Sequence, residues 1–364
     1  MKYNKKILIC SLFIIISITI LVVISRNSTK TFNYKGSTIA LTVDGNSATS
    51  FPASGKYNVT VNCDNAKGRW NPKTWKLEIT KITGTVTCDV SFNSSVINLT
   101  TQVNNKATRN QNGKRYQGKN PDNYIWFNDE LWRIIGNIPV CLTSGCSTTE
   151  NRVKIIRNDS IGAIAYNQTD YSSSSPLTWM GSNIQNLLNS CYLRKQSSCD
   201  SYCYSSSTRA KGTCDYSADG IDVNDFYGKM VEDVYFNVGA GDITYKTAAN
   251  YYTQEIATHA TSTSKIGLMY ASDWGYAIEG FTDVLGSDGS PQNSSDKNWL
   301  FSNGYEWTMS AYSSSYPLYV LYGGYLYFSS ASIGFAVRPV LYLKSNVYVV
   351  SGTGSKVDPY RIGM

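Results

Sequence analysis

The chain has 364 residues, of which 42% are hydrophobic and 16% are charged, with a formal net charge of +7. This is the composition of folded domains, and it excludes a disordered chain. Four basic residues lie in the first 26 positions, which hold no acid, so the remainder has 29 basic residues against 26 acidic ones. So small an excess of positive charge, without a long basic stripe, argues against nucleic-acid binding.

The N-terminal segment Ile7–Ile24 consists of 18 uncharged, mostly aliphatic residues. As a helix it would be about 27 Å long, enough to cross a bilayer. Three lysines precede it, which predicts a cytoplasmic N-terminus and a single-pass anchor over residues 1–26, with the rest outside the cell membrane. The exit from the segment lacks an Ala-x-Ala site, so an uncleaved anchor is favoured over secretion after cleavage near Ser25.

Eight cysteines follow the predicted span, in polar, loop-like contexts. Their even number predicts disulfides and therefore an extracellular compartment. Zinc is disfavoured because the closest cluster lacks two C-x-x-C pairs. We expect one bridge between Cys63 and Cys88 and a short one between Cys141 and Cys146. The other four, which allow three pairings, are Cys191, Cys199, Cys203 and Cys214.

Residues 27–100 are predicted to form a small all-β module. Alternating polar and apolar residues separated by Gly, Asn and Pro favour a reduced immunoglobulin-like sandwich. Its strands are expected at Thr38–Val43, Tyr57–Cys63, Trp75–Ile79 and Thr85–Phe92. Residues 101–121 show no apolar period and carry five basic residues without an acid, which predicts a solvated linker.

Residues 122–364 are predicted to form an α+β domain. It begins with a hairpin of Tyr124–Phe127 and Glu130–Ile135 around the Asn128-Asp129 turn, and Arg152–Arg157 forms a third strand. Helical spacing predicts helices over 182–191, with a capping box at Ser182, and over Val223–Val234. A Cys-rich insertion, 191–219, lies between them. Further strands are expected at Lys265–Tyr270, Glu306–Ser310, Leu318–Tyr322, Tyr325–Phe328 and Phe335–Leu343, with a hairpin turn at Gly323-Gly324.

Several segments of this domain are distinctive as a set: YIWFNDELWRIIG, NRVKIIR, KIGLMYASDWGYA, NWLFSNGYEWTMSAYSSS, GFAVRPVLYLKSNV and GTGSKVDPY. Together they resemble a family of uncharacterised surface proteins of Gram-positive-type bacteria, which implies an N-terminal anchor, β modules and a terminal domain of this kind. The GF-x-V-R-P segment beside WTMS resembles, at the level of fold, the C-type-lectin-like domain of formylglycine-generating-enzyme relatives. The reactive cysteines of those enzymes are missing here, because no cysteine follows Cys214, and the sugar-and-calcium motifs of C-type lectins are missing as well.

Catalytic motifs are weak throughout the chain. His259 is the only histidine, which limits His-dependent catalysis, and two S-x-x-K matches (Ser262 to Lys265, Ser294 to Lys297) lack an accompanying Lys-Thr-Gly. No spacing selects a glycosidase-like pair from the carboxylates Asp129, Glu130, Asp273, Glu279 and Glu306. Calcium could bind near Asp215, Asp219, Asp222 and Asp225, although the EF-hand pattern is absent and helix N-terminal charge is the simpler interpretation. We therefore predict no catalytic residues and no resident metal or cofactor.

Tyrosine is the most informative residue type, with 28 in the chain. Alternate residues of a strand share a face, so one face of the C-terminal hairpin could present rings to a ligand. The candidate ligand-binding residues are Tyr312, Tyr316, Tyr319, Tyr322, Tyr325, Tyr327, Trp274 and Trp299. The sequence thus predicts a membrane-anchored extracellular binding or adhesion protein whose partner is a cell-wall glycan or a surface protein. A wall-active, glycosidase-like hydrolase and a structural surface-assembly component are the alternatives.

Overall fold

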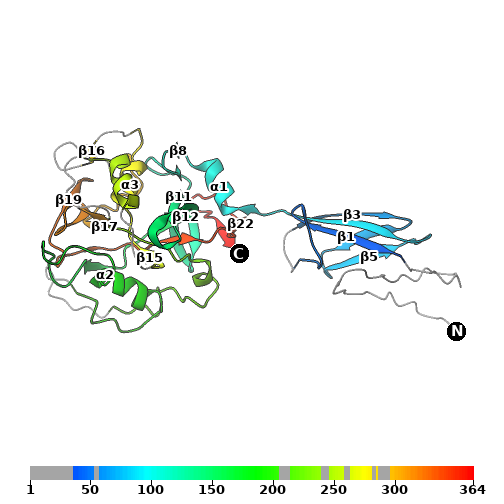
Figure 1. Ribbon diagram of the computed structural model, residues 1–364, viewed down its shortest axis with the longest axis horizontal. Coiled ribbons are helices and arrows are strands. Elements are labelled where there is room, and N and C mark those ends of the chain that lie inside the picture. The colour runs from blue at the N-terminus through cyan, green and yellow to red at the C-terminus, as the bar shows by residue number, and fades with distance from the viewer. Residues whose placement is uncertain are drawn as a thin grey trace. The chain divides into compact units, whose positions relative to one another are not determined.

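The computed structural model describes residues 36–52, 57–204, 214–238, 246–257, 263–280, 284–285 and 296–364 (Figure 1). It is mostly β-sheet with few helices, and it divides into two compact units at Ile97 and Asn98. The predicted span Ile7–Ile24 lies outside the described residues. Among the residues that are described, no helix is long and apolar enough to cross a membrane.

The first unit contains a four-stranded mixed sheet in the order β2-β1-β6-β3, with β1 parallel to β6 and β3 antiparallel to it. A separate hairpin is formed by β4 and β5. The strands are β1 (Thr38–Val43), β2 (Asn46–Ser47), β3 (Tyr57–Asp64), β4 (Lys67–Asn71), β5 (Lys76–Thr80) and β6 (Thr87–Ser94). The alternation read from the sequence therefore located β1, β3, β5 and β6 to within two residues.

The core of this unit lies between the sheet and the hairpin. In β6, the buried residues Cys88, Val90 and Phe92 alternate with more exposed ones, as expected for a strand with one face in a core. Trp70 of β4 packs edge-on against Phe92, with ring centres 4.7 Å apart. Cys63 lies directly opposite Cys88 in the β3–β6 register and the two form a disulfide, which confirms the predicted bridge.

Residues 101–121, predicted as a linker, belong instead to the second unit. The segment forms α1 (Leu99–Lys106), β8 (Arg109–Asn110) and β9 (Lys114–Arg115). The Asn98 side chain caps α1 by accepting from the Thr100 N–H, and Leu99 and Val103, one helical turn apart, are buried. Two apolar residues at this spacing anchor a short helix without producing a visible period, which is why the sequence looked unstructured.

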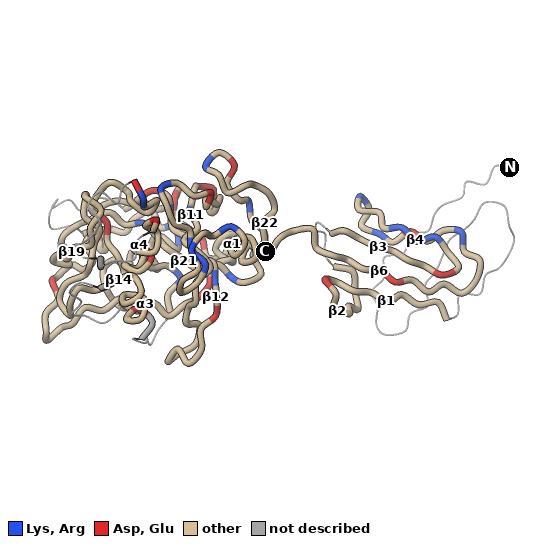
Figure 2. The backbone as a smooth tube through the Cα atoms, turned by 90° about the horizontal axis from the view of Figure 1, so that it is seen from above, with Lys and Arg blue, Asp and Glu red and all other residues tan. Residues whose placement is uncertain are grey.

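A central sheet in the order β15-β21-β12-β11-β9-β8 organises the second unit, with β10 paired to β11. Its further strands are β10 (Tyr124–Phe127), β11 (Glu130–Cys141), β12 (Thr149–Arg157), β15 (Ile266–Gly267) and β21 (Val340–Leu343). The turn between β10 and β11 places Asn128 and Asp129 at φ values of 53° and 59°, the conformation that a tight two-residue hairpin requires. Figure 2 shows Lys and Arg positions along β11 and β12.

A second sheet runs in the order β13-β20-β17-β18-β19. Its strands are β13 (Ala163–Ala165), β17 (Glu306–Ala311), β18 (Pro317–Val320), β19 (Leu326–Phe328) and β20 (Gly334–Ala336). The predicted strand over 335–343 is therefore divided between β20 and β21, which belong to different sheets. Two short antiparallel pairs are formed by β14 (Lys246–Thr247) with β16 (Val284–Leu285) and by β22 (Tyr348–Ser351) with β23 (Arg361–Gly363). Strand β7 (Ile97–Asn98) lies at the boundary of the units.

Helices are short. They are α2 (Asn183–Asn186), which continues as a π-helix over Leu187–Tyr192, α3 (Ala248–Ala257), α4 (Ala271–Ala277), and single 3₁₀ turns at Ser144–Cys146 and Gly228–Met230. Ser182 caps α2 as predicted, because its Oγ accepts from the Gln185 N–H at 3.2 Å. The Gln185 side chain accepts from the Gly181 N–H and not from the Ser182 N–H. The second hydrogen bond of the predicted capping box is therefore shifted by one residue.

The helix predicted over Val223–Val234 is wrong. Only the 3₁₀ turn at Gly228–Met230 is helical there. The side chains of Asp222 and Asp225 accept hydrogen bonds from the backbone N–H groups of Asn224 and Gly228, respectively. These local bonds stabilise turns, which form here in place of a helix. A Cβ on Gly228 would lie 1.9 Å from the Asp222 carbonyl oxygen, so the fold depends on glycine at this position.

All eight cysteines after the predicted span form disulfides. Cys141–Cys146 was predicted, and the insertion adopts the pairings Cys191–Cys199 and Cys203–Cys214, which the sequence left open. The four bridges, including Cys63–Cys88, fit a protein that folds outside the reducing cytoplasm.

Candidate functional site

Eight aromatic rings gather on the β13-β20-β17-β18-β19 sheet and its loops, and we call them the aromatic face. They come from the start of β17, from the β17–β18 turn, from β18, β19 and β20, and from the turn after β18. The residues are Tyr305, Tyr312, Tyr316, Tyr319, Tyr322, Tyr327, Phe328 and Phe335. The Gly323-Gly324 turn closes the β18–β19 hairpin as predicted, and it sets Tyr319 opposite Tyr327.

Ring contacts link the aromatic face into one continuous series. Tyr305 lies 5.7 Å from both Tyr322 and Tyr319, and Tyr319 lies 6.2 Å from Tyr327, measured between ring centres. The series continues from Tyr327 to Phe328 at 4.9 Å. Phe328 in turn contacts Tyr312 at 4.1 Å and Tyr316 at 5.4 Å, and Phe335 stacks on Tyr305 at 5.3 Å. Several neighbouring rings are nearly parallel, with interplanar angles of 13° to 20°.

The rings differ in how far they reach into solvent. Tyr322 is 64% exposed, and Tyr305, Tyr316 and Tyr327 are also exposed. Tyr319 is only 6% exposed and lies opposite the fully buried Trp307 in the β17–β18 register, with ring centres 6.0 Å apart. Trp307 Nε1 donates to the Ile164 carbonyl, which ties this pair to β13. The exposed tyrosines therefore border a buried pair of rings.

The aromatic face carries almost no charge. Between Lys297 and Arg338 the only charged residue is Glu306. Glu306 is buried and forms an ion pair with Arg338, whose Nε lies 2.8 Å from its Oε1. Serines flank the rings instead: Ser302, Ser313, Ser314, Ser315, Ser329, Ser330 and Ser332. Ligand binding here would rest on stacking and on hydrogen bonds to hydroxyl groups.

Two of the predicted ligand-binding residues lie elsewhere. Trp274 is 1% exposed in α4, and Trp299 is 4% exposed with its Nε1 donating to the Tyr116 carbonyl. Both belong to the core, so neither can contact a ligand at the surface. Tyr325 is half-buried beside the Gly323-Gly324 turn. Large rings fill cores as readily as they line binding surfaces, and single-residue patterns do not separate these roles.

Sequence reasoning missed Tyr305, Phe328 and Phe335 as members of the aromatic face. Tyr305 immediately precedes the predicted strand 306–310, and Phe335 begins another predicted strand. Their positions at strand starts could have placed them in the sheet. Only the pairing of β20 beside β17, however, brings Phe335 against Tyr305.

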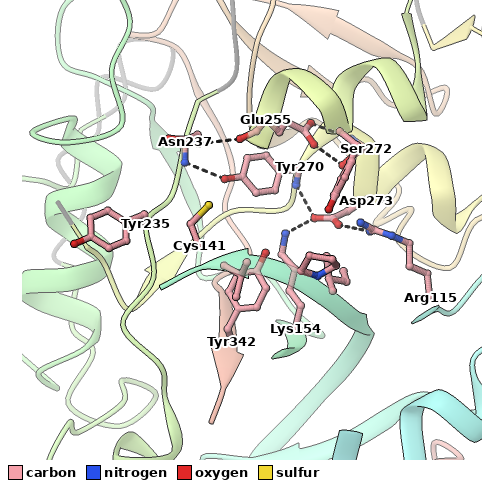
Figure 3. Close-up of a pocket in the computed structure, with 14 residues that line it drawn as sticks. Arg115, Cys141, Lys154, Tyr235, Asn237, Glu255, Tyr270, Ser272, Asp273 and Tyr342 are labelled. Atoms are coloured by element: carbon pink, nitrogen blue, oxygen red, sulfur yellow. Dashed lines mark hydrogen bonds and ion pairs between the residues drawn. The ribbon is translucent and has the colours of Figure 1, made fainter. Parts of the chain in front are cut away.

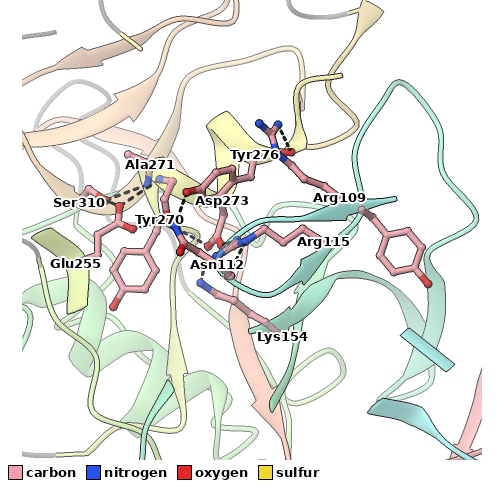
Figure 4. Close-up of polar contacts among 12 residues, drawn as sticks. Arg109, Asn112, Arg115, Lys154, Glu255, Tyr270, Ala271, Asp273, Tyr276 and Ser310 are labelled. Atoms are coloured by element: carbon pink, nitrogen blue, oxygen red, sulfur yellow. Dashed lines mark hydrogen bonds and ion pairs between the residues drawn. The ribbon is translucent and has the colours of Figure 1, made fainter. Parts of the chain in front are cut away.

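A second grouping is the buried charge cluster, formed by Arg115, Lys154, Glu255 and Asp273 (Figure 4). Arg115 Nη1 lies 2.7 Å from Asp273 Oδ1, and Lys154 Nζ forms an ion pair with Asp273 Oδ2. These side chains are at most 2% exposed. Asp273 also accepts from the Tyr270 N–H, which makes it the N-terminal capping carboxylate of α4. One carboxylate thus receives two cations and a backbone amide.

Aromatic rings surround the two cations of the cluster. Lys154 Nζ lies 4.4 Å from the ring centre of Tyr270 and 5.3 Å from that of Tyr342. The Arg115 guanidinium lies 4.6 Å from the Tyr276 ring centre. Burial lowers the pKa of Lys154, although the charge of Asp273 opposes this shift. Burial favours a raised pKa for Asp273, but Lys154 and Arg115 outweigh it and hold that pKa below its usual value.

Glu255 of α3 is buried in the same region. Its Oε1 accepts from Ser310 Oγ at 2.6 Å and from the Ser272 N–H at 3.2 Å, and its Oε2 accepts from Ser272 Oγ. Burial raises the pKa of Glu255 to about 7, with the negative charge of Asp273 adding to the effect against the serine hydrogen bonds. The fold therefore holds one carboxyl group able to exchange a proton near neutral pH.

A small cavity touches this cluster (Figure 3). Lys154, Glu255, Tyr270, Ser272 and Tyr342 are among its lining residues, and its volume is about 30 Å³. That space accommodates one or two water molecules. A sugar ring is much larger, so this cavity cannot bind a glycan.

The other carboxylates considered for catalysis are committed to structural roles. Glu130 binds Arg157, with two contacts of 2.8 and 2.9 Å to its Nε, and Glu306 binds Arg338. Asp129 occupies the β10–β11 turn, and Glu279 is an exposed residue that follows α4. These positions do not form a glycosidase-like pair at an open cleft.

The acidic residues considered for calcium do not converge either. Asp215 accepts from Ser217, while Asp222 and Asp225 cap the turns described above. Asp219 lies 3.9 Å from Arg157. Within the described part of the chain, no group of three or more His, Cys, Asp or Glu side chains could hold a metal ion. His259, Ser262 and Ser294, considered for catalysis, fall outside the described residues.

No protein-family model, curated protein or solved structure matches this chain. The described residues offer two chemically distinct regions: an exposed, uncharged aromatic face and a buried charge cluster.

Proposed function

We propose that this chain is a membrane-anchored extracellular binding protein that presents the aromatic face to a cell-wall glycan. The observation that carries the proposal is the continuous series of rings from Tyr322 to Tyr312, exposed at several positions and without a charged side chain. Sugar rings have apolar C–H faces and hydroxyl edges. Tyrosine matches both, because it combines a flat apolar ring with a hydroxyl group and loses little conformational entropy on binding.

Three features support an extracellular location at the membrane. Four disulfides are expected of a chain that folds in an oxidising compartment. The apolar segment Ile7–Ile24, preceded by lysines, would hold the chain in the cell membrane with the two units outside. The resemblance to surface proteins of Gram-positive-type bacteria points to the same location.

The proposal includes a fold assignment for each unit. In the first, a four-stranded sheet packed against the β4–β5 hairpin supports a reduced immunoglobulin-like sandwich that acts as a spacer. In the second unit, the predominance of β-sheet over helix supports a C-type-lectin-like arrangement. Its strand β10 pairs with the segment that precedes β23, since Trp126 N–H donates to the Tyr360 carbonyl and Tyr360 N–H donates to the Tyr124 carbonyl.

A neutral face favours a glycan over the other partners considered. The stretch from 298 to 337 offers only the buried Glu306, so complementary charge would add nothing from this stretch to the recognition of a protein partner. A wall-active hydrolase would need two carboxyl groups beside the bound sugar. Of the described carboxylates near the rings, Glu306 is neutralised by Arg338, and Asp170 accepts from the Ser332 N–H.

The proposal is tested by binding of the purified full chain to insoluble cell-wall polysaccharide and to a panel of soluble neutral glycans. The Tyr305→Ser/Tyr322→Ser variant removes two exposed rings and is expected to weaken binding about a hundredfold, since each ring is worth about tenfold. Phe226→Ser is the matched control, because Phe226 is an exposed ring outside the aromatic face.

Three other outcomes would overturn the proposal. Glycan binding that survives the double variant would place the site elsewhere. Hydrolysis of a wall polymer by the chain would favour the enzyme. Self-association that disappears in the double variant, without glycan binding, would favour a structural role in surface assembly.

A further inference from the structure

The Lys154–Asp273 pair has an unusual setting that the binding function does not require. Lys154 projects from β12, which lies in the central sheet, and Asp273 belongs to α4; the two are 119 positions apart in the chain. Both side chains are about 1% exposed. A buried ion pair is costly, because two charges leave water, and it is kept only where geometry and neighbours compensate.

We propose that Lys154 and Asp273 form a covalent amide bond, an intramolecular cross-link between β12 and α4. Three features carry the inference. The Lys154 amine is in contact with the Asp273 carboxyl group, both are shielded from bulk water, and Arg115 binds the other carboxyl oxygen of Asp273. Held in this arrangement, the two groups react as parts of one molecule, which replaces a bimolecular encounter by a high effective concentration.

The reaction balances without a further reagent. Lys154 Nζ, as the neutral amine, attacks Asp273 Cγ and forms the C–N bond, and the C–O bond to Oδ2 breaks. Oδ2 takes the two protons that Nζ gives up and leaves as one water molecule, so an ammonium and a carboxylate become an amide. Arg115 Nη1, 2.7 Å from Oδ1, stabilises the negative charge that develops on that oxygen.

The surroundings favour the neutral amine. The rings of Tyr270 and Tyr342 flank Nζ and separate it from bulk solvent. The bond removes one positive and one negative charge, so the net charge of the interior does not change.

The exposed pair Lys265–Asp233 provides an internal comparison. Its Nζ–Oδ2 distance is 2.6 Å, but the side chains are 24% and 58% exposed. Water solvates both groups and competes for the carboxylate, so no amide is expected there. Contact between amine and carboxylate alone is therefore not the criterion; burial is.

The test is the intact mass of the full chain, measured after complete reduction and denaturation so that disulfides do not contribute. The cross-linked chain is expected to be lighter than its sequence mass by one water molecule. Protease digestion should then yield one branched peptide that joins the Lys154 and Asp273 segments, and none that joins Lys265 to Asp233. Lys154→Arg keeps the positive charge and should restore the full sequence mass.

A wild-type chain at its full sequence mass, with Lys154 and Asp273 in separate peptides, would overturn the proposal whether or not any variant folds. Loss of water mapped to another residue would overturn it equally.

Discussion

The two chemically distinctive regions of the second unit invert the usual arrangement of a soluble protein. The buried charge cluster places Arg115, Lys154, Glu255 and Asp273 in the interior, whereas the aromatic face exposes rings and holds Glu306 beneath the surface. Charge is thus used for internal cohesion and apolar rings are used for contact. A surface adapted to electrostatic partners would show the opposite distribution.

This contrast separates stability from binding. Changes to the charge cluster should alter the free energy of unfolding and leave the chemistry of the surface intact. Changes to the exposed rings should do the reverse. Each prediction below tests one side of that separation.

The largest effect is expected for Asp273→Ala. It leaves Arg115 and Lys154 buried without their carboxylate, and removing one member of a buried ionic group costs about 3–5 kcal/mol. Chemical denaturation monitors the loss. The matched control is Asp296→Ala, which removes an exposed pair with Lys119 and should change stability by at most about 1 kcal/mol. Equal effects of the two variants would mean that the cluster does not stabilise the interior.

The next effect is a pH dependence that originates in Glu255. Its pKa is raised to about 7 in the folded chain, above its ordinary value of 4.5, so the folded state binds the proton more tightly than the unfolded state. Its contribution to stability is therefore complete below pH 4.5 and is lost as pH rises through 7, by about 3 kcal/mol. Asp273 does not contribute in this window: as a free carboxylate its depressed pKa acts at lower pH, and as the proposed amide it does not titrate. The free energy of unfolding, measured by denaturation at pH 5 and at pH 8, should differ less in Glu255→Gln than in the wild type. If the difference between the two pH values is unchanged in the variant, it originates in other groups.

A small effect on stability is expected for Tyr322→Ser. This ring is 64% exposed, so its removal should change the free energy of unfolding by no more than about 0.5 kcal/mol while weakening glycan binding about tenfold. Thermal unfolding and a binding isotherm on the same sample measure both. A loss of several kcal/mol would show that Tyr322 is structural, and the separation of roles would fail on this side.

The smallest expected change is in salt dependence. Because the aromatic face is uncharged, glycan affinity should vary by less than about twofold between low and high ionic strength. Isothermal titration at two salt concentrations checks this. A steep fall in affinity with added salt would require charged contacts, which the face does not offer.

The sequence predicted those strands and turns that are determined by residues close together in the chain. Alternation located β1 and β10 with correct bounds, and the Gly323-Gly324 turn fixed the β18–β19 hairpin that carries Tyr319, Tyr322 and Tyr327. Five of the eight rings of the aromatic face could thus be predicted. Phe335 joins it through the long-range pairing of β20 with β17, which leaves no signature within either segment.

The buried charge cluster could not be predicted for a related reason. Its four members come from β9, β12, α3 and α4, and no spacing relates them. Arg115 even stood in a segment that resembled a solvated linker, because isolated basic residues in polar sequence are usually exposed. The opposite error was made for Trp274 and Trp299. They were predicted to bind a ligand at the surface, but their rings are buried in the core.

The central claim is that the exposed rings, and not the buried charges, bind the ligand. It is tested most directly by comparing the affinity of wild type, Tyr305→Ser/Tyr322→Ser and Glu255→Gln for one neutral wall glycan at pH 7. The account predicts a loss of about two orders of magnitude for the tyrosine variant and wild-type affinity for the Glu255 variant. Loss of binding in the Glu255 variant with the tyrosine variant unaffected would contradict it.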